Sequence, residues 1–173
     1  MSSKSVSKSS ASQQSQRKAA ASQPDALEFL KSQHREVEDL FKQFEKLGDE
    51  GPSEEKEPIV RMACEKLTVH ASIEEEIFYP AAREIDDAES LLNEAEVEHN
   101  TAKDLIATLD SMDASDPMFS ATFTVLSEYI KHHVKEEEGE LFPKVKKSDL
   151  DLDALGQELA AQADELMSAQ EAS

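Results

Sequence analysis

The chain has 173 residues, enough for one domain with a single hydrophobic core and flanking tails. Its formal net charge of -20 argues against nucleic acid or an anionic membrane as a partner, because both are negatively charged. The single cysteine, Cys64, cannot form an internal disulfide, and no apolar run is long enough for a signal peptide or a membrane span, so we expect a cytoplasmic protein.

An N-terminal tail precedes a helical region. Residues 1–23 are rich in Ser, Gln, Ala and Lys with almost nothing to bury, and we expect them to be disordered. Residues 24–147 carry four stripes of apolar residues at spacings of three and four, which is typical of one face of a helix. The composition agrees with helices, because it includes only 4 glycines and 5% aromatic residues.

Prolines and an aspartate indicate the helix boundaries. Pro24, Pro58 and Pro117 each stand where a stripe begins, and proline is favoured at the first position of a helix. Asp86 fits the cap of the third helix. Pro80 is expected to kink the second helix or to end its regular part, because proline cannot donate the backbone hydrogen bond.

Short connections between the four helices favour antiparallel neighbours. The sequence therefore predicts an all-α fold in which residues 24–147 form an up-down-up-down four-helix bundle. Residues 148–173 form an acidic C-terminal segment. It has the pattern of a short amphipathic helix through Leu152, Leu155, Leu159 and Leu166, and its packing on the bundle is left open.

Each of the four stripes contains a histidine in register with its apolar residues. In the second and fourth helices a glutamate follows the histidine by four residues and therefore lies on the same face. This pairing occurs twice, in "HASIEEEIFYP" and in "HHVKEEEGELFP", each time with an aromatic residue and a proline after it. A bundle built from these stripes would bring six side chains to its centre: His34, His70, Glu74, His99, His133 and Glu137.

Buried carboxylates and imidazoles in this number favour a metal site. A lone histidine on an apolar face is usually an ordinary core residue, whereas four at matching depth indicate a ligand set. Burying an ionised carboxylate costs several kcal/mol or more unless it is paired or bound to metal. Four imidazoles and two carboxylates suit first-row transition metals, and carboxylates can bridge two ions. Manganese or mixed-metal occupancy fits the same ligands as iron.

The remaining polar residues of the two motifs receive an ordinary interpretation. We expect a solvated helix face for Glu75, Glu76, Glu136, Glu138 and Glu140. His132 adjoins His133 in sequence but points about 100° away from it, so it is expected beside the site or on the surface.

The motifs resemble the hemerythrin-like HHE cation-binding domain family over about residues 25 to 146. The resemblance is carried by His34, by "HASIEEEIFYP", by "EVEHNTAKDLI" around His99, and by "HHVKEEEGELFP". It implies a four-helix bundle around two non-haem iron ions bridged by carboxylates. Carried over to this sequence, His34, His70, His99 and His133 would be terminal ligands, and Glu74 and Glu137 would be the bridges.

One departure from the resemblance bears on function. The invertebrate oxygen carriers of the family have a fifth histidine, and the corresponding position here is Lys103, whose ammonium group cannot ligate while charged. Glu38 or Glu96 lies close enough in sequence to replace it, and Tyr79 or Tyr129 is a remoter alternative. A missing ligand opens a coordination position, which argues against reversible oxygen carriage and favours the activation of small oxidants.

The first functional hypothesis is a di-iron protein that binds or reacts with O2, H2O2 or NO, in oxygen or iron sensing or in stress defence. The alternative is an enzyme with peroxidase- or catalase-like turnover, or an iron donor for the repair of iron-sulfur clusters. A third reading is a purely structural acidic bundle, in which the histidines only pack. The oligomeric state and any redox partner stay open at this level.

Overall fold

The computed structural model describes residues 23–173, and the predicted tail thus falls almost wholly outside the described residues. The described part contains helices and no strand, which confirms the all-α prediction. In chain order its elements are α1 (Ala26–Leu47), α2 (Ser53–Ile73), η1 (Glu74–Phe78), α3 (Tyr79–Ala82), α4 (Glu89–Ser111), α5 (Pro117–Glu136), η2 (Glu137–Leu141), α6 (Phe142–Lys147) and α7 (Leu152–Glu171). The elements named η are π-helical turns, which are wider than the α-helix on either side.

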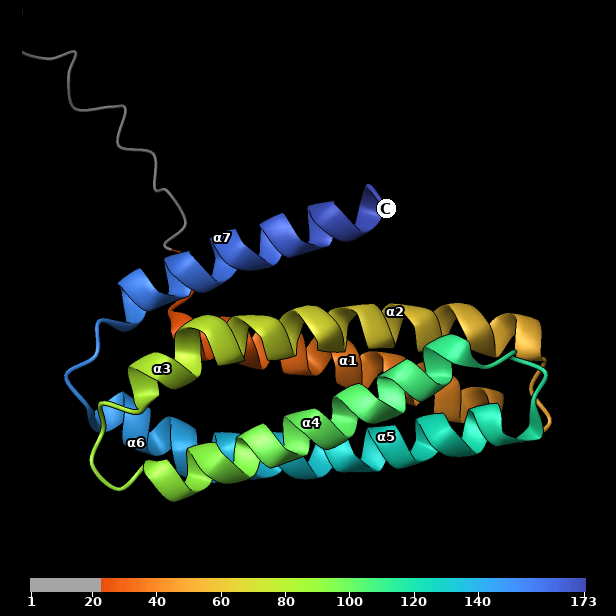
Figure 1. Cartoon of the computed structure of the whole chain (residues 1–173), viewed down its shortest axis with the longest axis horizontal. Coiled ribbons are helices and arrows are strands. Elements are labelled where there is room, and N and C mark those ends of the chain that lie inside the picture. The colour runs from red at the N-terminus through yellow and green to blue at the C-terminus, as the bar shows by residue number, and fades with distance from the viewer. Residues whose placement is uncertain (1–22) are drawn as a thin grey trace, which may run out of the picture.

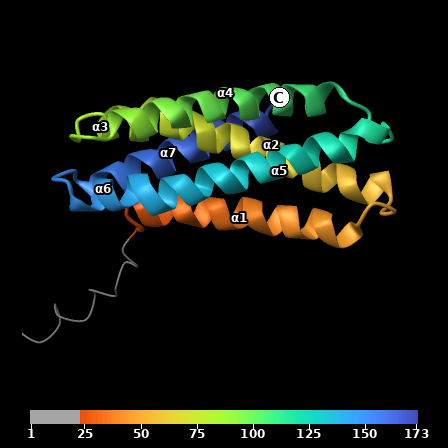
Figure 2. The same ribbon diagram turned by 90° about the horizontal axis from the view of Figure 1, so that it is seen from below.

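The four longest helices before α7 lie side by side and alternate in direction. Figure 1 shows α1 running to the right, α2 returning, α4 running to the right again and α5 returning. Helix α1 contacts α2 and α5, and α4 contacts α5 and α2, so the four helices surround one interior (Figures 1 and 2). Side chains on the inward face of each helix therefore meet those of the other three.

Helix α7 is longer than the sequence suggested. We expected a short helix, but it extends over 20 residues, from Leu152 to Glu171. It packs along α1 and α2 (Figure 1), and Leu159 and Ala163 of α7 are buried in that contact. The C-terminal segment is therefore part of the packed structure.

Two of the predicted helix starts, those of the second and third helices, are wrong. Helix α2 begins at Ser53 directly after the Gly48–Pro52 loop, and Pro58 lies inside it. Helix α4 begins at Glu89 without a side-chain cap, so Asp86 does not cap it. Helix α1 begins two residues after Pro24, where the Asp25 carboxylate accepts a hydrogen bond from the backbone N–H of Glu28 at 2.9 Å.

Helix α5 begins at Pro117, as predicted. The carboxylate of Asp116 caps it by accepting a hydrogen bond from the N–H of Met118 at 2.8 Å. Its start is therefore set by a cap and a proline together.

The regular part of the second helix ends ahead of Pro80, as expected: α2 stops at Ile73, a π-helical turn follows, and the short helix α3 contains the proline. In a regular α-helix the ring of Pro80 would clash with the carbonyl four residues earlier. Here the chain widens first, so that the N–H of Tyr79 donates to the carbonyl of Glu74, five residues back. The second motif repeats this geometry, since the N–H of Phe142 donates to the carbonyl of Glu137 ahead of Pro143. The helical path continues through both prolines.

The apolar core is divided into two clusters by a polar layer. On α1 the buried residue Leu30 belongs to one cluster and Val37 to the other, with His34 between them. On α4, Ala95 and Ala102 flank His99 in the same way. The polar layer is therefore closed off from water by apolar packing at both ends, which makes any unsatisfied polar atom in it costly.

None of the helices among residues 23–173 has both the length and the apolar composition needed to cross a lipid bilayer.

Candidate metal centre

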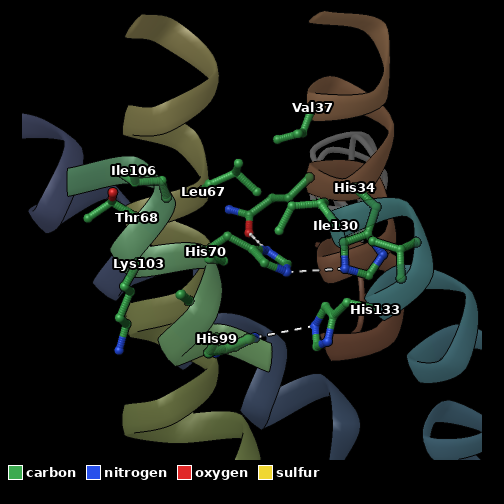
Figure 3. A pocket seen from close by; sticks show the side chains of 14 residues that line it. His34, Val37, Leu67, Thr68, His70, His99, Lys103, Ile106, Ile130 and His133 are labelled. Atoms are coloured by element: carbon green, nitrogen blue, oxygen red, sulfur yellow. Dashed lines mark hydrogen bonds between the residues drawn. The ribbon is translucent and has the colours of Figure 1, made fainter. Parts of the chain in front are cut away.

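The structure brings all six predicted ligands together in the polar layer. They come from α1, α2, η1, α4, α5 and η2, and each is at most 6% exposed. We call this set the centre: His34, His70, Glu74, His99, His133 and Glu137. The four imidazoles surround one small cavity (Figure 3).

The four histidines form two pairs that face each other through their Nε2 atoms. The Nε2 atoms of His34 and His70 are 3.1 Å apart, and those of His99 and His133 are 3.3 Å apart. Figure 3 marks both contacts with dashed lines. Each pair thus presents two nitrogen donors to one point, as two ligands of one ion would.

Glu74 and Glu137 each reach both histidine pairs. The Oε1 of Glu74 lies 3.2 Å from His70 Nε2, while its Oε2 lies 3.2 Å from His99 Nε2. The Oε2 of Glu137 lies 3.3 Å from His34 Nε2 and 3.8 Å from His133 Nε2. Glu74 thus divides its two oxygens between the two donor pairs, while one oxygen of Glu137 lies between them, and both arrangements suit a carboxylate shared by two cations.

Two oxygens of the centre are buried without a hydrogen bond. Among the described residues, these are Oε1 of Glu74 and Oε2 of Glu137. A buried acceptor left unsatisfied costs about 1–3 kcal/mol, and more when it is charged. Both atoms lie against imidazole Nε2 atoms, and a nitrogen and oxygen donor set of this kind suits a first-row divalent ion. The residues present therefore fit a metal site.

Every histidine of the centre is held from outside by a hydrogen bond at its other nitrogen. Each Nδ1–H donates to a side-chain oxygen, at distances between 2.6 and 3.0 Å. This leaves the Nε2 lone pair pointing inward in the neutral ring, as metal-binding histidines require. The acceptors are Glu138 for His34, Gln33 for His70, Glu75 for His99 and Glu98 for His133.

The charges of the centre shift the pKa values of its members. Burial lowers the pKa of His133, but the hydrogen bond to Glu98 and the charges of Glu137 and Glu74 outweigh burial and raise it to about 9. Burial also lowers the pKa of His34, but Glu137 and Glu74 outweigh burial and raise it. Burial opposes ionisation of Glu74, yet the adjacent imidazoles hold its pKa well below the usual value. Without metal the centre therefore holds protons in the place of cations.

Tyr79 joins the two carboxylates. Its hydroxyl lies 3.2 Å from Glu74 Oε2, 3.2 Å from Glu137 Oε1 and 3.1 Å from His99 Nε2. Burial raises the pKa of Tyr79 well above its usual value, and the charges of both carboxylates add to this effect. The phenol therefore keeps its proton and donates a hydrogen bond to a carboxylate oxygen.

The cavity beside the four imidazoles is small and mainly apolar. Its volume is about 30 Å³, and its walls include Val37, Leu67, Ala102, Ile106 and Ile130 (Figure 3). A cavity needs roughly 10–15 Å³ of such space to hold one water molecule. The cavity therefore has room for a small molecule of a few atoms.

A family model, described as the hemerythrin HHE cation binding domain, matches residues 25–145 of the chain. The chain belongs to the hemerythrin HHE family. Among solved structures it is similar to the crystal structure of a hemerythrin HHE cation binding domain-containing protein from Mycobacterium kansasii. The two share 26% identity with a TM-score of 0.70, over 84% of this chain and 89% of the other. No curated protein matches it.

The glutamates considered as replacements for the fifth histidine of the invertebrate oxygen carriers are engaged elsewhere. Glu38 pairs with Arg35 at 2.8 Å, and Glu96 pairs with Arg83 at 2.6 Å. Tyr129 is exposed. Only Tyr79, the remoter alternative, touches the centre, through its hydroxyl.

Lys103 stands at the edge of the cavity and acts on the centre indirectly. Its Nζ lies 2.6 Å from Glu75 Oε2, while Glu75 Oε1 accepts the hydrogen bond from His99. The ammonium group therefore fixes the acceptor that orients His99.

The expectation of a solvated face was wrong for Glu75 and Glu138. Both are partly buried and hold histidines of the centre, whereas Glu76 and Glu140 are exposed as expected. Glu136 is partly buried and lies 3.2 Å from the exposed His132. These assignments separate the side chains that support the centre from those that face water.

The sequence did contain a signal for the outer acceptors. Gln33 directly precedes His34, Glu98 directly precedes His99, and Glu75 and Glu138 directly follow the two glutamates of the centre. A residue next to an inward one points about 100° away along the helix surface, and here that direction leads to the histidine of a neighbouring helix. The polar residues beside four of the six inward side chains were therefore informative.

Proposed function

We propose that this chain is a non-haem di-iron protein that binds or reacts with O2, peroxide or nitric oxide, in oxygen or iron sensing or in stress defence. The observation that carries the proposal is that the two carboxylate oxygens of Glu74 lie 3.2 Å from different histidine pairs, Oε1 from His70 and Oε2 from His99. One ion needs one such pair, so two pairs joined by shared carboxylates support two ions. The alternation of α1, α2, α4 and α5 supports reading the fold as the up-down-up-down four-helix bundle.

The division of labour among the residues follows from their positions. His34 and His70 would hold one ion, His99 and His133 the other, with Glu74 and Glu137 shared between them. The irons would supply redox chemistry and open coordination positions for a small ligand. The apolar cavity restricts the size of that ligand and limits the access of water.

Tyr79 gives the site a proton donor that stays buried. Its hydroxyl lies between Glu74 Oε2 and Glu137 Oε1, and it keeps its proton because burial and the negative charges of the two carboxylates raise its pKa. Such a donor stabilises negative charge that develops on a ligand or on a carboxylate next to it.

A second candidate is peroxidase- or catalase-like turnover, which this phenol favours. Peroxide chemistry is helped by a hydrogen-bond donor in a site closed to bulk water, and Tyr79 is only 1% exposed. Replacement of Tyr79 by Phe is expected to lower peroxide turnover while the iron content is retained. Equal turnover in the two proteins would argue against the enzymatic role and leave ligand binding.

The proposal is tested by metal content and spectroscopy on the full chain from iron-replete cells. We expect two irons per chain and near-ultraviolet charge-transfer bands that change on reduction and exposure to air. Glu74→Ala or Glu137→Ala is expected to lower the content below one iron per chain, because either change removes a shared ligand. Glu76→Gln is the matched control, since Glu76 is exposed two residues from Glu74. Full iron content in the alanine variants would contradict the bridging roles.

A further inference from the structure

A second group of metal-binding side chains lies on the surface between α4 and α5. It consists of Glu98, His132 and Glu136, and we call it the surface triad. One ligand atom from each lies within 4.8 Å of the others, a spacing that one cation can span. The side chain of His132 is 60% exposed and that of Glu98 only 16%. The triad therefore reaches from solvent into the protein.

Glu98 connects the surface triad to the centre. Its Oε1 lies 3.7 Å from His132 Nε2 on the outside, and its Oε2 accepts a hydrogen bond of 2.6 Å from His133 Nδ1 on the inside. The same carboxylate thus contacts an exposed imidazole and a buried one.

A small cavity lies between the surface triad and the centre. Its volume is about 10 Å³, and its lining includes Glu98 and Glu136 of the surface triad together with His133 and Glu137 of the centre. Glu137 carries one of the two buried oxygens without a hydrogen bond, and its side chain is 2% exposed. A cavity of this size holds roughly one water-sized particle, so it suits a cation that has shed most of its water.

The charge of the surface triad is not neutralised by lysine or arginine. In the described part of the chain, the ion pairs of Glu98 and Glu136 are made with histidines alone. By contrast, Glu96, two residues before Glu98 on α4, pairs with Arg83. Two carboxylates beside an exposed imidazole attract divalent cations, and the imidazole favours transition metals over magnesium and calcium.

We propose that the surface triad captures a divalent first-row transition ion, Fe²⁺ in the setting of the proposed function, and passes it through the small cavity to the centre. The inference rests on the proposed function, because it presupposes a centre that takes up metal. No bond is made or broken other than those between the ion and its ligands, and the ion keeps its charge throughout.

The test is the rate of anaerobic Fe²⁺ uptake by the metal-free full chain. Free Fe²⁺ is followed with a coloured indicator after rapid mixing, and bound iron is measured after desalting. The variant His132→Gln/Glu136→Gln removes two triad ligands and leaves Glu98, which orients His133, in place. We expect its uptake at low Fe²⁺ to be roughly 10-fold slower than that of the native chain, with the same final iron content. Glu128→Gln, an exposed charge change on the same helix, is the matched control and should load at the native rate.

A second measurement detects the surface site itself. The iron-loaded protein is expected to bind one further Mn²⁺, seen by electron paramagnetic resonance, and Mg²⁺ in moderate excess should not displace it. The double variant should lose this Mn²⁺, whereas Glu128→Gln should keep it. Native-rate loading by the double variant, or retention of its Mn²⁺, would overturn the surface triad and leave the di-iron proposal intact. Failure of the native chain to take up any Fe²⁺ would overturn the proposed function, and the inference with it.

Discussion

Glu138 orients His34 from outside the centre, and in the proposed di-iron site its replacement is expected to weaken the binding of one of the two ions. Its Oε1 accepts the hydrogen bond from His34 Nδ1 at 2.7 Å, and Arg35 contacts both of its oxygens at 3.0 and 2.7 Å. Changes to such supporting residues typically cost 10–100-fold in metal affinity. Glu138→Gln keeps an oxygen acceptor but loses the charge, so we expect about 10-fold, or about 1.4 kcal/mol. Glu138→Ala loses both and should cost roughly 100-fold, or about 2.7 kcal/mol.

The assay is an anaerobic Fe²⁺ titration against a competing chelator, which resolves a stronger and a weaker binding step. The structure predicts that only one step weakens, because His99 and His133 keep their own acceptors, Glu75 and Glu98. Glu140→Gln is the control, since Glu140 lies in the same π-helical turn and carries the same charge but is exposed. If Glu138→Ala binds both ions as tightly as Glu140→Gln does, the supporting role of Glu138 is wrong.

Three other properties follow from burial and charge. Burial lowers the pKa of His133, but Glu98 and the carboxylates of the centre raise it to about 9, so the imidazole is protonated below that pH. Because a protonated imidazole cannot bind a metal ion, chelator competition should show that the Kd for Fe²⁺ falls as the pH rises towards 9. A constant Kd would contradict this. Burial raises the pKa of the Cys64 thiol to about 12, so a thiol reagent should label the unfolded chain far faster than the native one, and equal rates would refute it. In Gly156→Ala the new methyl would lie 2.7 Å from a backbone oxygen ahead of α1, so unfolding experiments should show a loss of about 1–3 kcal/mol, whereas Gly139→Ala, with open space around it, should show none.

The inward residues were predictable because the helix period fixes which side chains share a face. His34, His70, His99 and His133 stand in register with Leu, Val and Ile, so any packing that buries the stripes also buries the imidazoles. The same rule places Glu74 with His70. No knowledge of how the helices cross was needed to bring these groups to one level.

The hydrogen bonds around the centre could not be predicted in the same way, because they run between helices. Whether Gln33 meets the imidazole of His70 depends on the rotation of α1 against α2, which packing sets and the stripes do not. The start of α2 shows the same limit. Pro58 looked like a first residue, yet the helix begins five residues earlier, at Ser53, and contains the proline.

The two copies of the repeated motif differ in the aromatic residue that directly precedes the proline. Tyr79 and Phe142 occupy the same position, directly before Pro80 and Pro143 and directly after a π-helical turn. The Tyr79 hydroxyl contacts His99 Nε2 at 3.1 Å, whereas the ring of Phe142 stacks on His34 with centroids 6.0 Å apart and an angle of 8° between the planes.

Duplication therefore explains the shared framework of the two halves, in which a histidine and a glutamate lie one turn apart and a wide turn carries the chain past a proline. It does not make the two halves chemically equal. One phenolic oxygen places a proton donor beside the His99 and His133 pair, while an apolar ring covers His34. A centre built from two copies of one motif thus has two different ends, and a small ligand that needs a proton has a reason to bind at one of them.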